Sequence, residues 1–198
     1  MSYEVLLISG PAGVGKSTLS WEISAQLREA EVPHVVLDSD ELDRAWPLSD
    51  KERDALNRAN LTAFWQHAAA LGYARLVLAG VFLDSDAARA WIGAAIPEAR
   101  IVRVVLQASD VELERRVRER EIGSGAESQV ARSLRQAARF RRRNRASSDT
   151  IETSAVGPTA LAYEVIQRTG WLPASPARPN ENAPTTSRRP GQRTGSTR

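Results

Sequence analysis

Residues 10–17 read Gly-Pro-Ala-Gly-Val-Gly-Lys-Ser, which fits the pattern G-x-x-x-x-G-K-[ST]. A short apolar run at residues 3–9 (YEVLLIS) leads into this stretch, and a helical pattern follows it at 16–29. Glycines between a strand and a helix let successive backbone N–H groups face one anion, and the helix N-terminus adds positive potential. Because a chance match has a probability of about one in a thousand in a chain of this composition, the stretch predicts a phosphate-binding loop.

The residues of this loop have expected roles toward ATP and Mg²⁺. We expect the Lys16 ammonium to reach the β- and γ-phosphate oxygens and to act in catalysis. We expect the Ser17 hydroxyl to be a ligand of Mg²⁺. The full set of loop residues predicted to bind the nucleotide is Gly10, Ala12, Gly13, Val14, Gly15, Lys16, Ser17 and Thr18.

Strand and helix patterns alternate on both sides of the loop. Strands are predicted at 3–9, 34–37, 75–81, 101–106 and 149–153, and helices at 16–29, 49–71, 84–96, 109–121, 127–143 and 158–168. Capping boxes, Ser-x-x-Glu, start two of the helices at Ser49 and Ser109. Short strand–helix units imply right-handed crossovers. We therefore predict an α/β fold, a three-layer α/β/α sandwich around a five-stranded parallel sheet.

The positive charge of the chain lies mainly at its C-terminal end. The chain has 27 basic and 24 acidic residues, but residues 1–177 hold 22 basic and 23 acidic ones. From Pro173 on, the sequence is rich in Pro, Ser, Thr and Arg and has no hydrophobic period, so we expect a disordered basic tail at 173–198 and one domain at 1–172. The net charge does not require a basic nucleic-acid-binding face, and we do not expect nucleic acid as a partner.

The cysteine count and the length of the apolar runs indicate the cellular compartment. There is no cysteine, which excludes disulfides, thiolate metal sites and cysteine nucleophiles. No apolar run approaches ~18 residues, and we expect neither a membrane span nor a signal peptide. A cytoplasmic location is expected.

Two acids follow the second predicted strand, in the order Asp38-Ser39-Asp40. Ligands bind at the carboxyl ends of parallel strands, where these carboxylates could hold Mg²⁺ through water and accept a proton from a substrate hydroxyl. The competing interpretation is plain turn and N-cap chemistry. The nearby phosphate loop favours the functional interpretation.

An arginine-rich helix supplies the next candidates. Arg116 and Arg120 are four residues apart and share a helix face, and arginines aimed into a phosphate site stabilise transferring charge. The alternative is a solvated face paired with the neighbouring glutamates. That alternative is favoured for most arginines of this region, and for Arg116 and Arg120 both interpretations stay open.

The third predicted strand ends in Ala79-Gly80-Val81, where motor-type ATPases and helicases usually carry an aspartate. This weighs against those two classes. Asp84 could substitute, but it fits an N-cap equally well. We expect Gly80 to allow close approach of the backbone to a substrate or phosphate.

Together these residues resemble the small P-loop kinases of shikimate, gluconate and adenylylsulfate, over roughly residues 3–169. The resemblance implies that Asp38 serves the metal and Asp40 the acceptor hydroxyl. It also implies that Arg116 lies near adenine and Arg120 near the phosphates, beside a mobile helical lid at about 122–130. The chain lacks the Arg-Pro-Leu lid sequence of shikimate kinases and any substrate motif of one member.

The predicted function is ATP-dependent transfer of the γ-phosphoryl group to a hydroxyl of a small-molecule acceptor. A nucleoside or nucleotide kinase is one alternative, with Arg44, Trp46 and Trp65 flanking a base, although core packing of both tryptophans is favoured. A nucleic-acid-associated P-loop ATPase that uses the basic tail is another. The sequence determines neither the acceptor nor the oligomeric state.

Overall fold

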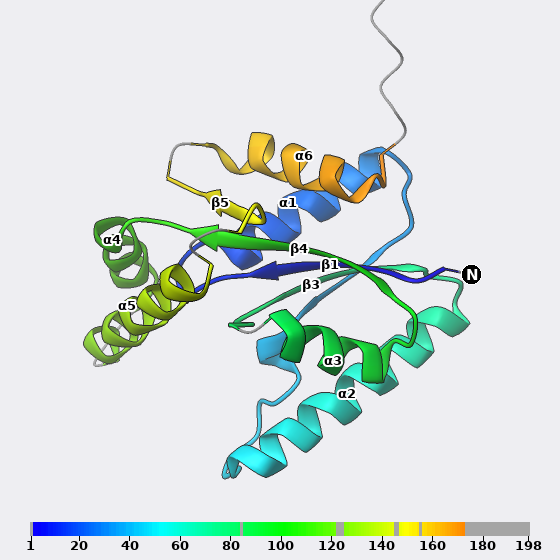
Figure 1. Ribbon diagram of the computed structural model, residues 1–198, viewed down its shortest axis with the longest axis horizontal. Coiled ribbons are helices and arrows are strands. Elements are labelled where there is room, and N and C mark those ends of the chain that lie inside the picture. Colours follow the sequence, from blue (N-terminus) through cyan, green and yellow to red (C-terminus); the bar gives the residue numbers. More distant parts are fainter. Residues whose placement is uncertain (1, 84, 122–124, 145–146, 155, 173–198) are drawn as a thin grey trace, which may run out of the picture.

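Five parallel strands run through the centre of the structure, a computed structural model that describes residues 2–83, 85–121, 125–144, 147–154 and 156–172 (Figure 1). Their order across the sheet is β2-β3-β1-β4-β5, and every neighbouring pair is parallel. The strand bounds are Glu4–Ser9 for β1, Val35–Asp38 for β2, Arg75–Gly80 for β3, Arg100–Gln107 for β4 and Thr150–Glu152 for β5. The predicted five-stranded parallel sheet is confirmed.

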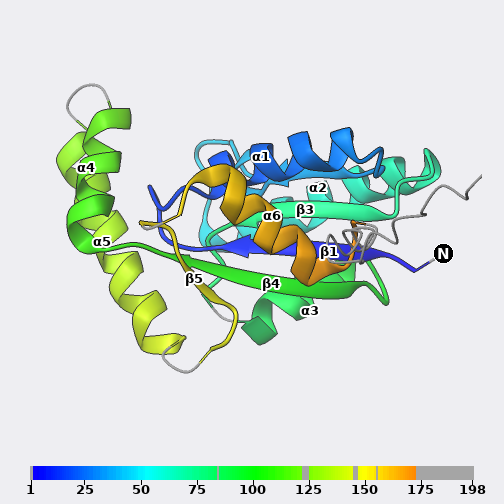
Figure 2. The same cartoon turned by 90° about the horizontal axis from the view of Figure 1, so that it is seen from above.

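Helices cover both faces of this sheet. The helices α1 (Lys16–Glu29) and α6 (Pro158–Thr169) lie on one face, and α2 (Asp50–Ala70) and α3 (Ser85–Ala95) lie on the other (Figure 1). The remaining pair, α4 (Asp110–Arg120) and α5 (Ala126–Arg143), packs together beyond the carboxyl ends of the strands, as Figure 2 shows. The architecture is therefore the predicted three-layer α/β/α sandwich.

The strand β1 explains why the sheet is buried on both faces. Its side chains alternate between two cores, because successive residues of a strand point to opposite faces. Leu6 and Ile8 pack with α1 and α6, and Val5 and Leu7 pack with α2 and α3. This alternation requires apolar residues at every position, which is the continuous apolar run seen in the sequence.

Of the two predicted capping boxes, one is complete in the structure and the other forms only one of its two hydrogen bonds. At α2, the Ser49 side chain accepts from the Glu52 N–H and the Glu52 carboxylate accepts from the Ser49 N–H, so the box is complete. At α4, Ser109 accepts from the Glu112 N–H, but the Glu112 carboxylate binds arginines of its own helix. The second box was therefore only half right, because charge-assisted bonds to guanidinium groups outcompete a neutral backbone N–H.

Some sequence predictions concern residues outside the described ranges. These are the proposed N-cap at Asp84, residues 122–124 of the proposed lid, and the tail at 173–198. Residues 126–130 of the proposed lid form the first turns of α5. None of the helices in the described ranges is long and apolar enough to cross a membrane.

Candidate active site

The phosphate loop joins β1 to α1 and is held against α4. Gly13 has φ +78°, a left-handed conformation that glycine adopts without strain. A Cβ added at Gly13 would lie 2.6 Å from Cγ2 of Val117 on α4. The glycine is thus required both by the turn of the loop and by its close packing on a neighbouring helix.

Lys16 is buried at the start of α1 and faces back into the loop. Its Nζ donates to the carbonyl oxygens of Gly10 and Pro11, at 3.1 Å each. Burial lowers the pKa of Lys16 from 10.5 to about 8, and the charges of Arg120 and Arg132 add to this shift. Asp40 and Asp38 oppose it. These five side chains therefore share one electrostatic site.

Ser17 and Asp38 are in direct contact. The strand β3 lies between β1 and β2 in the sheet, but the start of α1 reaches across it. The Ser17 hydroxyl donates to Oδ2 of Asp38 at 2.9 Å. Oδ1 of Asp38 accepts from the Asp40 N–H at 3.1 Å and caps the short 3₁₀ helix at Ser39–Glu41. Asp38 thus serves as an N-cap with one oxygen and faces the loop with the other, so the two interpretations of this residue are compatible.

Asp40 lies where two cavities meet. The loop cavity, of about 820 Å³, opens over the phosphate loop, and the α2–α3 cavity, of about 530 Å³, lies between those two helices. Asp40 and Val81 line both. The Asp40 side chain is exposed, and within the described ranges no hydrogen bond reaches its carboxylate.

The loop cavity brings together nearly all of the predicted site residues. Those that line it are Ala12, Gly13, Val14, Gly15, Lys16, Ser17, Thr18, Asp38, Asp40, Arg116 and Arg120. Gly10 is buried below the cavity and contributes the carbonyl that Lys16 binds.

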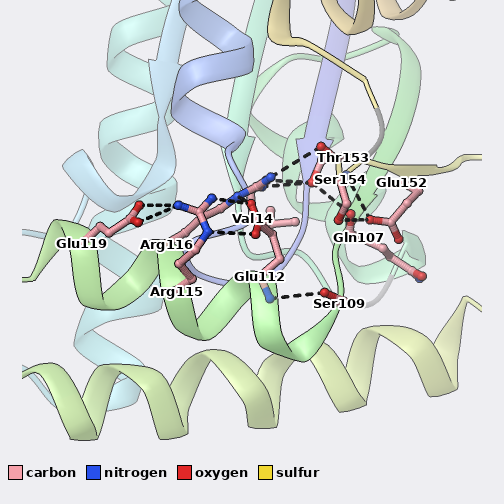
Figure 3. Close-up of polar contacts among 10 residues, drawn as sticks. All are labelled: Val14, Gln107, Ser109, Glu112, Arg115, Arg116, Glu119, Glu152, Thr153 and Ser154. Carbon is pink, nitrogen blue, oxygen red and sulfur yellow. Dashed lines mark hydrogen bonds and ion pairs between the residues drawn. The ribbon is translucent and has the colours of Figure 1, made fainter.

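The two arginines of α4 are held differently. Arg116 donates from Nη1 to the Val14 carbonyl at 3.2 Å and to Oγ1 of Thr153 at 3.1 Å, and its Nε donates to Glu112 (Figure 3). It therefore braces the phosphate loop. Arg120 pairs with the adjacent Glu121 at 2.8 Å and lines the same cavity.

Other arginines of this helix form the solvated face that the alternative predicted. Arg115 binds Glu112 and Glu119, and Figure 3 shows its guanidinium group between these two carboxylates. These contacts are exposed. Hydrogen bonds from Arg115 and then Arg116 lower the pKa of Glu112 to about 2. The charges of this face thus satisfy one another at the surface.

Helix α5 contributes two site residues that the sequence reasoning missed, Gln136 and Ser133, and a third, Arg132, for which the sequence favoured a solvated face. Oε1 of Gln136 accepts from the Ala12 N–H at 2.9 Å, and the Ser133 hydroxyl donates to the Ala12 carbonyl at 2.7 Å. Arg132 lines the loop cavity. One sequence signal could have indicated these residues. Polar side chains recur every three or four residues along this arginine-rich helix, and one of them, Ser133, is fully buried.

Gly80 has a different role from the predicted one. A Cβ at this position would lie 2.2 Å from Oγ of Ser39 and 2.5 Å from Cε2 of Phe82. The space beside Gly80 is thus filled by the protein itself and not left for a ligand. Gly80 allows the segment after β2, which carries the two aspartates, to pack against the end of β3.

The residues proposed to flank a base do not line the loop cavity. Trp65 is buried and makes an edge-to-face contact with Tyr3 at 5.2 Å, as core packing predicts. Trp46 is 92% exposed, so core packing was wrong for it. Arg44 pairs with Glu41 at the surface. These positions give no support to a base-binding role.

Comparison with protein families gives a match over most of the chain. Residues 5–146 match the model of a P-loop family described as "AAA domain". The chain belongs to this AAA domain family. No curated protein matches the chain.

Solved structures share the fold of this family member at low sequence identity. A gluconokinase from Sinorhizobium meliloti 1021 has a TM-score of 0.55 and 16% identity, covering 86% of this chain and 94% of its own. The tunicamycin resistance protein of Deinococcus radiodurans has a TM-score of 0.54 and 18% identity, covering 88% and 99%. The APS kinase CysC of Mycobacterium tuberculosis has a TM-score of 0.53 and 18% identity, covering 84% and 97%. The fold is that of the small P-loop metabolite kinases.

Proposed function

We propose that the protein is an ATP-dependent kinase that transfers the γ-phosphoryl group to a hydroxyl of a small-molecule acceptor. The position of Asp40 carries this proposal: its carboxylate, which accepts no hydrogen bond from the described part of the chain, lies where the loop cavity and the α2–α3 cavity meet. A nucleotide in the first cavity and an acceptor in the second would thus react beside a potential general base.

The residues of the loop cavity fit a nucleotide triphosphate. The Lys16 ammonium is buried, and its hydrogen-bond acceptors among the described residues are two neutral carbonyls, so anionic phosphate oxygens would be stronger partners for it. Arg120 and Arg132 add positive charge at the same cavity. Together these groups would offset the charge that spreads over the transferring phosphoryl group.

The pair of Ser17 and Asp38 fits Mg²⁺. A hydroxyl and a carboxylate oxygen, 2.9 Å apart, are the hard oxygen ligands that this ion takes. Among the described residues no group of three or more His, Cys, Asp or Glu side chains could hold a metal, so phosphate oxygens and water would complete the coordination. When bound, Mg²⁺ supplies positive charge at the phosphate oxygens.

The acceptor hydroxyl oxygen forms a bond to the γ-phosphorus while the bond from that phosphorus to the β–γ bridging oxygen breaks, and ADP leaves. The hydroxyl proton passes to the Asp40 carboxylate.

The test is mass-spectrometric detection of phosphorylated products from a panel of hydroxylated metabolites with ATP and Mg²⁺. Lys16→Ala is expected to abolish transfer, and Lys51→Ala, at the other lysine of the chain and exposed on α2, is expected to retain it. ATP hydrolysis that no member of the panel accelerates, with no phosphorylated product, would instead identify a P-loop ATPase.

We further propose that the kinase domain spans 1–172, with 173–198 as a basic tail, and that the enzyme acts in the cytoplasm. The absence of cysteine throughout the sequence supports this compartment. The near-neutral charge of residues 1–177 supports a small-molecule acceptor over nucleic acid.

A further inference from the structure

The α2–α3 cavity carries a chemical signature of its own. Its walls come from the segment after β2, from α2, from the segment after β3 and from α3. It is separate from the loop cavity except at Asp40 and Val81. The side chains that face it therefore decide which acceptor the proposed kinase takes.

Among the described residues that line this cavity, three carboxylates, those of Asp40, Asp43 and Asp54, face a single guanidinium group, so the lining carries net negative charge. Its arginine, Arg58, is paired with Asp54 at 3.0 Å, and neither a lysine nor another arginine of the described ranges lines it. Recognition of a carboxylate, sulfate or phosphate on the acceptor calls for an arginine or lysine, or for several free N–H groups. A negatively charged acceptor would instead meet the carboxylates of Asp40 and Asp43.

Two side-chain oxygens at this cavity, Oδ1 of Asp43 and Oδ1 of Asn57, can only accept hydrogen bonds. Oδ2 of Asp43 accepts from Arg53 and from Nδ2 of Asn57, both at 3.0 Å, so the carboxylate is held in place while no hydrogen bond within the described ranges reaches its Oδ1. Oδ1 of Asn57 is buried and has no hydrogen-bond partner among those same residues. A buried carbonyl without a partner is costly, and a donor on a ligand would remove that cost.

An aromatic pair forms another part of the wall. The rings of Phe82 and Trp91 are 5.4 Å apart and tilted by 39°. The backbone of Phe82 is fixed by Ser9, whose hydroxyl donates to the Phe82 carbonyl at 2.8 Å and accepts from its N–H at 3.1 Å. A rigid aromatic surface beside carboxylates favours a C–H face or an ammonium group of a ligand.

We propose that the acceptor is a hydroxylated amine, an amino alcohol or amino sugar, and that anionic acceptors are excluded. The ammonium and hydroxyl groups donate to Asp43 and Asn57, an apolar face packs on Phe82 and Trp91, and the reacting hydroxyl lies at Asp40. This inference rests on the proposed kinase function, since it names the acceptor class of the same site.

The experiment uses the full chain with ATP, Mg²⁺ and three matched sets of probes that differ mainly in charge. Glucosamine, glucose and gluconate form one set, and each further set pairs an amino alcohol with its neutral and carboxylate analogues. Phosphorylated products are quantified for each probe. We expect turnover of at least one amine, with kcat/KM at least about tenfold above its neutral analogue, and none of the anions.

Two variants connect the preference to the cavity. Asp43→Asn keeps an oxygen for Arg53 and is expected to lower kcat/KM for the amine about tenfold and to change that for the neutral analogue much less. Asp110→Asn, which removes an exposed carboxylate paired with Arg141 on α5, is the control and leaves the preference unchanged. Melting temperatures verify that each variant is folded.

The outcomes separate the inference from the proposed function. Phosphorylation of gluconate or another anion would overturn the inference and leave the proposed kinase function supported. Equal turnover of the amine, the neutral analogue and the anion would have the same consequence. Phosphorylation of no probe, while ATP turnover still depends on Lys16, would overturn both. An amine preference that Asp43→Asn does not alter would overturn the role given to this cavity.

Discussion

The loop cavity and the α2–α3 cavity meet at Asp40, but their lining residues are distributed differently along the sequence. The loop cavity is built around the consecutive residues 12–19, and α4, α5, α6 and the ends of β2, β3 and β5 complete its walls. The α2–α3 cavity is shaped by side chains of two helices and two loops that are distant in sequence. A backbone site needs particular residue types at fixed spacing, whereas a side-chain site leaves no local pattern. The loop cavity can therefore be recognised from a local sequence motif, whereas the α2–α3 cavity becomes visible only in the folded structure.

The buried lysine allows the strongest test of the loop cavity, made on the nucleotide-free protein. Between pH 8, near the pKa of Lys16 in the fold, and pH 10.5, its ordinary value, the unfolded chain binds a proton that the folded chain has lost. The free energy of unfolding therefore rises with pH across this window, by up to about 3 kcal/mol. Lys16→Met is expected to remove this rise, as measured by urea denaturation at both ends of the window.

Lys51→Met is the matched control, because Lys51 is exposed and should leave the rise intact. An unchanged pH dependence in Lys16→Met would mean that the ammonium is not buried as described.

A substitution at Gly80 is expected to displace the segment that lies between the two cavities. Gly80→Ala places a methyl group within 2.2 Å of Oγ of Ser39, and overpacking of this kind costs about 1–3 kcal/mol. We expect that loss in chemical denaturation, together with reduced transfer, since the segment that carries Asp38 and Asp40 must move. Gly93→Ala, at a helical glycine with open space around it, should be neutral or slightly stabilising. Equal stability of the two variants would remove the steric role given to Gly80.

The connection between α5 and the phosphate loop should have a smaller effect. Gln136→Leu leaves the Ala12 N–H without its acceptor, which costs about 1 kcal/mol of folding stability. Gln136→Glu keeps an acceptor oxygen and should restore most of that stability. If the Leu and Glu variants unfold at the same denaturant concentration, the hydrogen bond contributes nothing measurable.

Removal of residues 173–198 is expected to have the smallest effect. The composition of this segment predicts that it buries little apolar surface, so its loss should leave the melting temperature and the turnover unchanged. Scanning calorimetry of the full and shortened chains makes the comparison. A decrease of several degrees would place part of the tail within the domain.

The sequence predicted the elements and the phosphate loop because both depend on local patterns. The continuous apolar run of β1 and the complete capping box at Ser49 each involve neighbouring residues. The half-formed box at Ser109 shows the limit of such patterns, since two arginines on the same helix compete for the Glu112 carboxylate.

The missed residues all act across long distances in the chain. Gln136 and Ala12 are 124 residues apart, and their contact depends on how α5 is rotated about its axis. The pairing of Asp43 with Asn57 likewise depends on how α2 packs beside the segment after β2. The role given to Gly80 was wrong for the same reason, because its neighbour Ser39 comes from another strand end.

A comparison of Asp38→Asn with Asp40→Asn tests most directly the proposal that phosphoryl transfer takes place at Asp40. Nucleotide affinity is titrated with and without Mg²⁺ and set beside acceptor turnover for both variants. We expect Asp40→Asn to lower turnover by about 10²–10⁴ while Mg²⁺-dependent nucleotide affinity stays within a few-fold. We expect Asp38→Asn to weaken the Mg²⁺ dependence as well, through its contact with Ser17. If Asp40→Asn keeps turnover within tenfold of the unaltered protein, Asp40 is not the base and the claim is contradicted.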